Sequence, residues 1–162
     1  MKSIQELLDT LPQTGKVEWI GIRRIRRQAM EVVNEVQTLL DSGLEGDRYA
    51  GKSGTRQVTL IQAEHLPVIA SCIGLEVVDP GLLRRNLVVS GINLLALKNR
   101  HCMIGGVRLE ITGQCHPCSR MEELLGAGGY NAVRGHGGVT ARVTQNGVIA
   151  LGDGVQMCLI QS

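Results

Sequence analysis

The sequence predicts a mainly β protein, a strand-rich barrel or sandwich with two or three short helices. Two observations indicate this class: many short segments are rich in branched apolar residues, and most of the 21 glycines lie between them. The chain has 162 residues, of which 43% are hydrophobic and 20% charged, enough for one packed domain. We expect a single domain over residues 1–162, with a core over about 15–160 and a short N-terminal helix over 1–14.

The helices are predicted from their capping signals. Ser3 and Glu6 form a capping-box pattern ahead of several leucines, so a short helix should end near Pro12. A second helix is expected over 62–72, kinked or shortened by Pro67. A third should begin at Pro117, which suits the first position of a helix because its missing N–H would be unpaired there.

The strands are predicted from apolar segments bounded by turn residues. They span 17–23, 30–36, 57–61, 87–89, 107–112, 138–144, 148–151 and 155–160. Asn146 and Gly147 lie between two of them and form a strong signal for a type I′ hairpin. The glycine-rich segment 43–57 has the composition of a long loop, and loops of that length are often functional.

The composition narrows the classes of partner. There is no Phe, one Trp and two Tyr, so the aromatic faces on which single-stranded nucleic acids stack are nearly absent. The net charge of +2 does not indicate a polyanion, yet arginine outnumbers lysine by 13 to 4 and binds phosphate or carboxylate well. We expect a small anionic ligand and no nucleic acid. The basic segment 23–27 is either a solvated strand end or an anion contact.

Nothing in the sequence directs the chain to a membrane or out of the cell. Glu6 and Asp9 interrupt the stretch where a signal peptide would be apolar, and Glu76 interrupts the longest apolar segment, 68–78. We therefore expect a cytoplasmic protein. Its five cysteines form an odd, uneven set that we expect to be reduced.

The segment CHPC at 115–118 carries the chemistry that the sequence suggests. If Pro117 opens a helix, Cys118 lies in its first turn, where the positive end of the helix favours a thiolate. That effect is only about 0.3–1 kcal/mol, so a reactive thiolate also needs a nearby cation. Arg120 and His116 are the local candidates.

Other interpretations of the cysteines remain open. Cys72, Cys102 and Cys158 are most simply small buried apolar residues. For Cys115 and Cys118, a structural zinc site would need two further ligands, and a redox dithiol would fit the spacing but not the surrounding strand pattern.

Five segments follow one another within roughly residues 15–160: GLEGDRYAG, RQVTLIQAEHL, RRNLVVSGINL, IGGVRLEITGQCHPCSRME and GHGGVTARV with a later GD. Together and in this order they resemble the MOSC domain, named after the C-terminal domain of molybdenum cofactor sulfurase, in its small stand-alone bacterial form. The resemblance implies a barrel similar to the pyruvate-kinase-type β-barrel. It also implies that Cys118, with Cys115 beside it, is the cysteine that carries sulfur or molybdenum.

The resemblance further implies the cofactor and its contacts. The molybdenum cofactor (molybdopterin) would meet Arg48, Arg56, Arg85, Asn86 and His136, with Cys118 as the metal ligand. Each position has a structural alternative: Arg85 and Asn86 as a solvated strand end, Asp47 with Arg48 as an ion pair within the loop, and His136 in a turn. Arg134 and Lys52 are weaker candidates for phosphate contact.

Three functions follow as hypotheses. The first is a molybdenum-cofactor-binding or sulfur-carrier domain in which Cys118 ligates molybdenum or carries a persulfide. The second is a molybdenum-dependent reductase of N-hydroxylated bases or amides that works with a separate electron-donor reductase. The third is a zinc-stabilised structural or interaction domain. In the sulfur-carrier case, pyridoxal phosphate would be present only on a partner enzyme, a cysteine desulfurase.

Overall fold

The computed structural model describes residues 1–49 and 53–159. Its strands are β1 (Gly15–Ile22), β2 (Glu31–Val33), β3 (Glu35–Leu39), β4 (Gly43–Leu44), β5 (Val58–Gln62), β6 (Leu87–Ser90), β7 (His101–Ile104), β8 (Val107–Gln114), β9 (Val139–Gln145), β10 (Val148–Ala150) and β11 (Gly154–Cys158). Its helices are α1 (Ile4–Leu8), α2 (His65–Cys72), α3 (Ser119–Leu125) and α4 (Gly129–Val133), with 3-10 turns η1 (Pro80–Leu83) and η2 (Leu94–Leu97).

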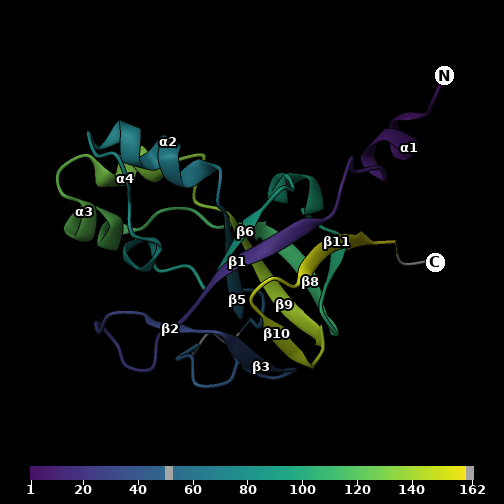
Figure 1. The fold of residues 1–162 in the computed structure, drawn as a ribbon, viewed down its shortest axis with the longest axis horizontal. Coiled ribbons are helices and arrows are strands. Elements are labelled where there is room, and N and C mark those ends of the chain that lie inside the picture. The colour runs from purple at the N-terminus through teal and green to yellow at the C-terminus, as the bar shows by residue number, and fades with distance from the viewer. Residues whose placement is uncertain (50–52, 160–162) are drawn as a thin grey trace.

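Seven strands close into a β-barrel in the order β11-β7-β8-β9-β5-β6-β1, with β1 pairing back to β11. The strand β2 extends the sheet from β1, and β10, β3 and β4 form a second, three-stranded sheet. Figure 1 shows α2, α3 and α4 gathered on one side of the barrel, and α1 projecting away from it at the N-terminus. The predicted mainly β barrel is confirmed.

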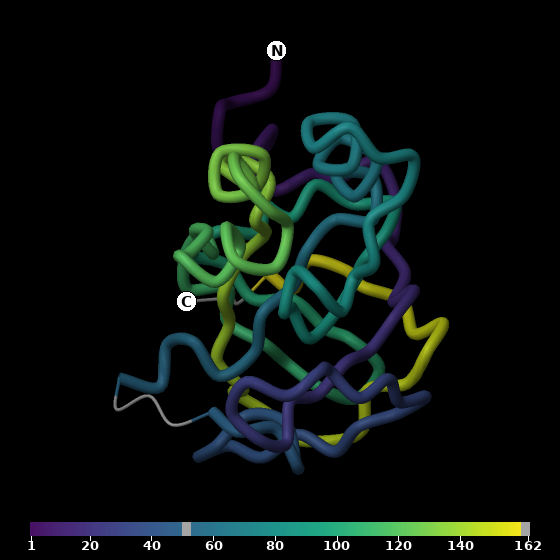
Figure 2. Tube along the Cα trace, turned by 90° about the vertical axis from the view of Figure 1, so that its left-hand side faces the viewer, coloured from purple at the N-terminus to yellow at the C-terminus, as the bar shows by residue number. Residues whose placement is uncertain are grey.

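Two hydrophobic cores stabilise this arrangement, one inside the barrel and one outside it. The strands contribute to both because successive residues of a strand point to opposite faces. Leu60 of β5 and Leu87 of β6 lie in the barrel interior. Their neighbours Ile61 and Val88 lie on the outer face, in a second core that includes Met121 of α3. The second core therefore fixes the helices against β5 and β6. Figure 2, turned by 90°, shows these helices from the side they cover.

The chain changes sheets at two points where the sequence predicted continuous structure. The expected strand 30–36 is broken at Asn34: β2 pairs with β1, and β3 pairs with β10. The expected hairpin at Asn146 and Gly147 is wrong, because β9 pairs with β5 and β8, while β10 pairs with β3. Neither residue has the positive φ that a type I′ turn requires. Gly147 instead exchanges hydrogen bonds with Thr38 of β3.

The helices differ from the prediction in number and position. Within the described residues there are four short α-helices, against the expected two or three, and the unexpected one is the five-residue α4. The capping box of Ser3 and Glu6 is confirmed. Pro67 lies in the first turn of α2, where its missing N–H costs no intrahelical hydrogen bond. In the described parts of the chain, no helix has the length and apolar character needed to span a membrane.

Candidate functional site

The loop that carries Cys115 and Cys118 connects β8 to α3 and is held by its backbone. The N–H of Cys115 donates to the carbonyl oxygen of Gly138 at 2.8 Å. Gly137 packs so closely that a Cβ there would lie 2.2 Å from the Cys115 carbonyl oxygen. The loop can therefore adopt this position only with a glycine at 137.

The two cysteines of the loop have different environments. Cys115 is buried, with 3% of its surface exposed, whereas Cys118 is exposed and free. Cys118 is the N-cap residue of α3, with φ −126° and ψ 174°, and not part of the first helical turn. The expected helix start at Pro117 is therefore wrong by two residues. Since α3 has only seven residues, the positive charge around Cys118 comes mainly from neighbouring cations.

Those cations line a cleft of about 490 Å³ beside Cys118. We call it the arginine cleft, because eight arginines line it: Arg23, Arg26, Arg27, Arg48, Arg56, Arg84, Arg85 and Arg120. Cys115, His116 and Cys118 form one side of it. Among its described lining residues, Asp47 is the single carboxylate, so the cleft is strongly positive. This fits the small anionic ligand that the arginine excess predicted.

Little of this charge is neutralised by ion pairs. Among the described side chains, Arg120 is the one cleft arginine in a salt bridge, with Glu123 at 2.5 Å. Arg23 has a buried Nε without a hydrogen-bond partner, the one buried side-chain nitrogen or oxygen of the described chain in that state. A buried donor without a partner costs about 1–3 kcal/mol, which an anion in the cleft could relieve.

Asp47 organises the wall of the cleft. It accepts a hydrogen bond from the backbone N–H of Arg23 at 2.7 Å, and the N–H of Arg48 donates to the Arg23 carbonyl oxygen at 2.7 Å. Burial raises the pKa of Asp47, and the Arg23 N–H and the charges of Arg23 and Arg48 oppose that shift. The alternative of an Asp47–Arg48 salt bridge is not found between the described side chains.

Arg84 is the cation that sequence reasoning missed. It has a left-handed backbone, with φ 57°, and its Nη1 donates to the Gln28 carbonyl oxygen at 3.1 Å. Burial and the charges of Arg23 and Arg120 lower the pKa of Arg84, while Cys118 and Asp47 oppose that shift. Arg84 and Cys118 both line the arginine cleft. The RRN segment at 84–86 was the only sequence signal for Arg84, and it was interpreted as a signal for Arg85 and Asn86.

Arg85 lies in the wall of the cleft and faces backbone oxygens. Its Nε donates to Gly137 at 2.8 Å, its Nη1 to Leu83 at 2.8 Å, and its Nη2 to Cys115 and His116 at 3.5 Å. It is 6% exposed. Arg85 is therefore no solvated strand end. Its two contacts with the carbonyl oxygens of Cys115 and His116 position the cysteine loop, while those with Gly137 and Leu83 anchor the guanidinium.

Asn86 is also buried and joins three strands. Its Oδ1 accepts from the backbone N–H of Thr59 at 3.0 Å, and its Nδ2 donates to the Gly21 carbonyl oxygen at 3.1 Å. Because these bonds use both the oxygen and the NH₂ group of the amide, Asn86 supports the wall of the cleft. Arg48 and Arg56, by contrast, are exposed at the cleft and available to a ligand.

His136 lies outside the arginine cleft. Its ring packs edge-on against His65 of α2, with centroids 5.2 Å apart. Its N–H donates to the Val133 carbonyl oxygen, as in the turn that the sequence offered as the alternative. Arg134 is exposed, bonds Asn131 and does not line the cleft. Lys52 lies outside the described residues.

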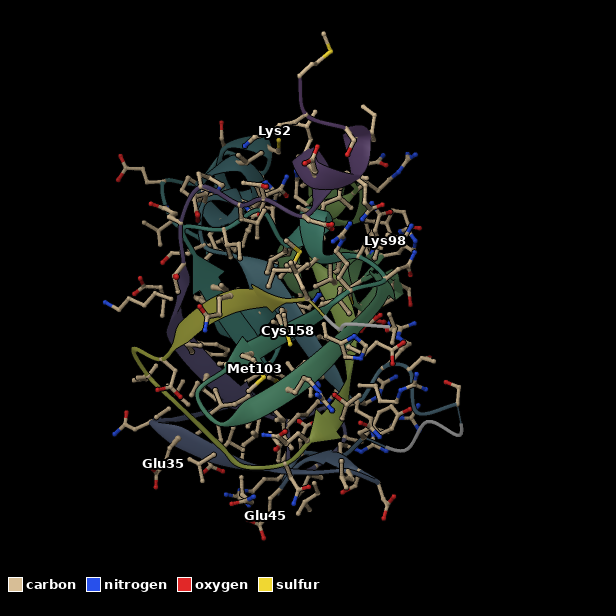
Figure 3. The ribbon with its side chains drawn as sticks, turned by 90° about the vertical axis from the view of Figure 1, so that its right-hand side faces the viewer. Lys2, Glu35, Glu45, Lys98, Met103 and Cys158 are labelled. Atoms are coloured by element: carbon tan, nitrogen blue, oxygen red, sulfur yellow. The ribbon has the colours of Figure 1, made fainter. Side chains whose placement is uncertain are left out.

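The other cysteines lie away from the cleft. Cys102 is buried as expected, and burial with the neighbouring Cys158 raises the pKa of its thiol to about 12. Cys158 is half-buried on β11, on the face shown in Figure 3. The expectation of a buried Cys72 is wrong, since Cys72 is exposed at the end of α2. In the described residues, no group of three or more His, Cys, Asp or Glu could hold a metal ion.

The sequence matches the model of the MOSC domain over residues 46–156. The chain therefore belongs to the MOSC domain family, which is associated with the molybdenum cofactor. No significant match was found among curated proteins.

Solved structures support the same fold. The YuaD protein from Bacillus subtilis has a TM-score of 0.77 and 20% identity, covering 88% of this chain and 94% of that chain. YiiM from Escherichia coli has a TM-score of 0.71 and 18% identity, covering 93% and 72%. YiiM from Geobacillus stearothermophilus has a TM-score of 0.70 and 16% identity, covering 90% and 75%. At these identities, the likeness concerns the fold.

Proposed function

We propose that this protein binds the molybdenum cofactor in the arginine cleft, with the thiolate of Cys118 as a molybdenum ligand. The observation that carries the proposal is the pairing of an exposed thiol with a cleft lined by eight arginines. A thiol alone would suit many reactions. A thiol beside a concentrated positive charge suits an anionic cofactor that contains a soft metal.

The residues present fit this cofactor. Its phosphate needs guanidinium or backbone donors, and a thiolate is a suitable soft ligand for its metal. The buried Nε of Arg23 lacks a partner among the described residues, and Arg48 and Arg56 are exposed at the cleft. A cleft of about 490 Å³ also falls within the roughly 300–1,000 Å³ usual for sites of cofactors and small molecules.

Each part of the site has a role in this proposal. Arg23, Arg48 and Arg56 bind the anionic groups, while Arg85 fixes the backbone of the cysteine loop. Cys118 loses its thiol proton when it becomes a ligand, and its exposure lets that proton leave to water. Arg84, close to Cys118, stabilises the resulting thiolate. When bound, the cofactor supplies redox chemistry at its metal.

Sulfur transfer is a second use of the same thiol, and the exposure of Cys118 favours it. The Cys118 thiolate would attack the outer sulfur of a donor's persulfide. A new S–S bond forms on Cys118, the donor's S–S bond breaks, and the donor cysteine leaves as a thiolate. The donor would be a cysteine desulfurase that carries its own pyridoxal phosphate. This use does not by itself explain the eight arginines.

A reductase of N-hydroxylated bases or amides would need both the cofactor and an electron-donor protein. The exposed Cys118 lies where such a protein could approach. Nothing in the described residues supports the zinc-stabilised alternative, since they contain no group of three or more metal-ligating side chains. We therefore propose cofactor binding as the common basis, with reduction as an activity built on it.

Loading with isolated molybdenum cofactor tests the proposal. Wild-type protein, Cys118→Ser and the matched control Cys72→Ser, which changes another exposed cysteine, are incubated with cofactor and passed through a desalting column. Bound molybdenum is measured by elemental analysis and bound pterin by fluorescence after oxidation. Wild type and Cys72→Ser should retain both, whereas Cys118→Ser should lose molybdenum.

The result separates the two uses of Cys118. Retention of molybdenum by Cys118→Ser at the wild-type level would contradict ligation by this thiol. For the sulfur-carrier use, mass spectrometry after incubation with a desulfurase and cysteine should show one added sulfur atom in wild type and none in Cys118→Ser. Loss of an N-hydroxylated base in the presence of cofactor and an electron donor would support the reductase.

A further inference from the structure

A second pocket lies on the other side of the cysteine loop. It has a volume of about 240 Å³, and Cys115 and His116 line both this pocket and the arginine cleft. Pro117, Gly137 and Gly138 complete the side that the loop forms. The loop is thus a wall between two spaces. It is fixed by Arg85 through its carbonyl oxygens and by Gly138 through the N–H of Cys115.

The two spaces differ in charge. Eight arginines and one carboxylate line the cleft, whereas among the described residues of the pocket wall there is no Asp, Glu, Lys or Arg. Burial and the neighbouring His136 lower the pKa of His65, against the opposing charge of Glu64, and so disfavour a positive charge on that ring. We call this space the neutral pocket. An ion would lose its hydration there without gaining a partner of opposite charge.

Three side-chain amides, Gln62, Asn93 and Gln114, line the neutral pocket together with the imidazoles of His65 and His116. The Oε1 of Gln62 accepts from the Leu94 N–H at 2.9 Å, and the Oδ1 of Asn93 accepts from the Leu95 N–H at 3.1 Å. No hydrogen bond within the described chain uses the NH₂ groups of Gln62 and Asn93 or the amide of Gln114, and Asn93 and Gln114 are exposed. The pocket therefore offers several free donors and, at Gln114, an acceptor.

The apolar part of the lining comes from Leu94, Leu95, Pro117 and Val139. Leu94 and Val139 are 2% exposed, and Leu95 is half exposed at the pocket. A volume of about 240 Å³ exceeds the roughly 150 Å³ of an apolar cavity that holds benzene, and it is below the roughly 300 Å³ at which pockets for drug-sized ligands begin. The space suits a ligand built on one ring.

The geometry points to the neutral pocket as a binding site for a small uncharged ring compound that carries an amide or ring carbonyl group. Its carbonyl oxygen accepts from the free amide donors, its N–H donates to Gln114, and its ring packs on the leucines and Val139. A charged compound of the same shape is excluded by its desolvation and belongs in the arginine cleft. This site stands independently of the cofactor proposed for Cys118.

Nuclear magnetic resonance of the ¹⁵N-labelled protein without cofactor tests this site. The uncharged probes are nicotinamide, benzamide and 2-pyridone, and nicotinate is the charged counterpart of the first. Uncharged probes should shift the backbone signals of Gln114, Gly137, Gly138 and Val139. Nicotinate should leave those signals in place. Because the pocket is small, we expect dissociation constants of about 1 mM, equal to about 4 kcal/mol.

Two variants make the test specific. Gln114→Leu removes a polar amide of the pocket and should weaken binding of nicotinamide about three- to tenfold, the effect of one or two hydrogen bonds. Gln156→Leu changes an exposed glutamine of β11 outside the pocket and should bind as wild type does. Cys118→Ser should also bind nicotinamide normally, which separates this site from the proposed function.

Shifts at the pocket that weaken in Gln114→Leu but not in Gln156→Leu support the site. The absence of shifts with all three uncharged probes at about 20 mM, well above the expected dissociation constant, overturns it. Equal shifts of the pocket signals by nicotinate overturn the preference for an uncharged ligand. Shifts confined to residues of the arginine cleft overturn the location.

Discussion

Arg85 donates from its Nε to the carbonyl oxygen of Gly137 across 2.8 Å, and this bond joins the start of β6 to the segment before β9. The same guanidinium reaches the carbonyl oxygens of Cys115 and His116. A buried charge in this arrangement is stabilised by backbone dipoles, since no carboxylate pairs with it among the described side chains.

Replacing Arg85 should therefore reduce stability and displace the cysteine loop. Arg85→Met leaves several buried carbonyl oxygens without donors, and we expect a loss of about 2–4 kcal/mol in the free energy of unfolding. Urea unfolding followed by circular dichroism measures it. The control Arg134→Met, at an exposed arginine, should stay within about 0.5 kcal/mol of wild type. Equal losses in both variants would remove Arg85 from its positioning role.

The sequence predicted the class of fold because strand patterning is local. Most strands were placed to within a few residues, since branched apolar segments end at glycine or polar residues. Two short strands were not predicted, β7 and β4, and β4 lies in the segment expected to be a loop. Other errors arose where pairing is decided by distant residues. Asn146 and Gly147 have the composition of a hairpin, yet the hydrogen bonds between Gly147 and Thr38 direct the chain to the other sheet.

The sequence predicted only part of the site, because sequence motifs are local and the contacts of a side chain depend on distant residues. Family motifs identified Arg48, Arg56 and the two cysteines, all of which line the arginine cleft. They did not distinguish a ligand contact from a buried support, as Arg85 and Asn86 show. Arg84 was missed because its place beside Cys118 in the cleft depends on the packing of η1 beside α3, which no local pattern encodes.

Arg48 and Arg56 should contribute to anion binding without contributing to stability. Each is exposed and lines the cleft, so Arg48→Gln and Arg56→Gln remove charge without leaving a buried group unpaired. We expect each to weaken binding of inorganic phosphate about two- to fivefold, since exposed ionic contacts are worth about 0.2–1 kcal/mol. Calorimetric titration measures this.

Salt and a matched arginine provide the controls for phosphate binding. Added sodium chloride should reduce the differences between wild type and the two variants, because exposed charges are screened. Arg134→Gln, outside the cleft, should bind phosphate as wild type does. If Arg134→Gln weakens phosphate binding as much as Arg48→Gln, the effect is due to overall charge and not to the cleft.

Asp47 should make the stability of the protein depend on pH in a defined direction. Its pKa is raised above 3.8 in the folded state, mainly by burial. The folded protein therefore holds this proton more tightly than the unfolded chain. The associated stability is present at low pH and is lost as pH rises through the folded-state pKa.

Asp47→Asn keeps an oxygen that can accept from the Arg23 N–H and removes the titration. Relative to this variant, wild type should lose stability as pH rises above 3.8, measured by thermal unfolding at a series of pH values. Sulfate binding by wild type should also weaken as pH rises, because the carboxylate of Asp47 repels an anion in the cleft. A constant difference across this pH range would contradict the assignment to Asp47.

Gly138 and Gly135 provide a matched pair for the segment that supports both the cysteine loop and β9. Both have a positive φ, 86° and 80°, so alanine at either position meets a similar backbone strain of about 1–2 kcal/mol. Their surroundings differ. A Cβ at Gly138 would lie 1.9 Å from the carbonyl oxygen of Leu60, whereas a Cβ at Gly135 has no heavy atom within 4 Å.

Gly138→Ala should therefore be far more harmful than Gly135→Ala. The Leu60 oxygen belongs to the backbone of β5 and cannot move without disturbing the barrel. We expect Gly135→Ala to cost about 1–2 kcal/mol and Gly138→Ala at least about 4 kcal/mol in the free energy of unfolding, or loss of folded protein. Thermal unfolding of both variants measures the difference. Similar melting temperatures would mean that the close approach of Gly138 to Leu60 does not hold the cysteine loop against β5.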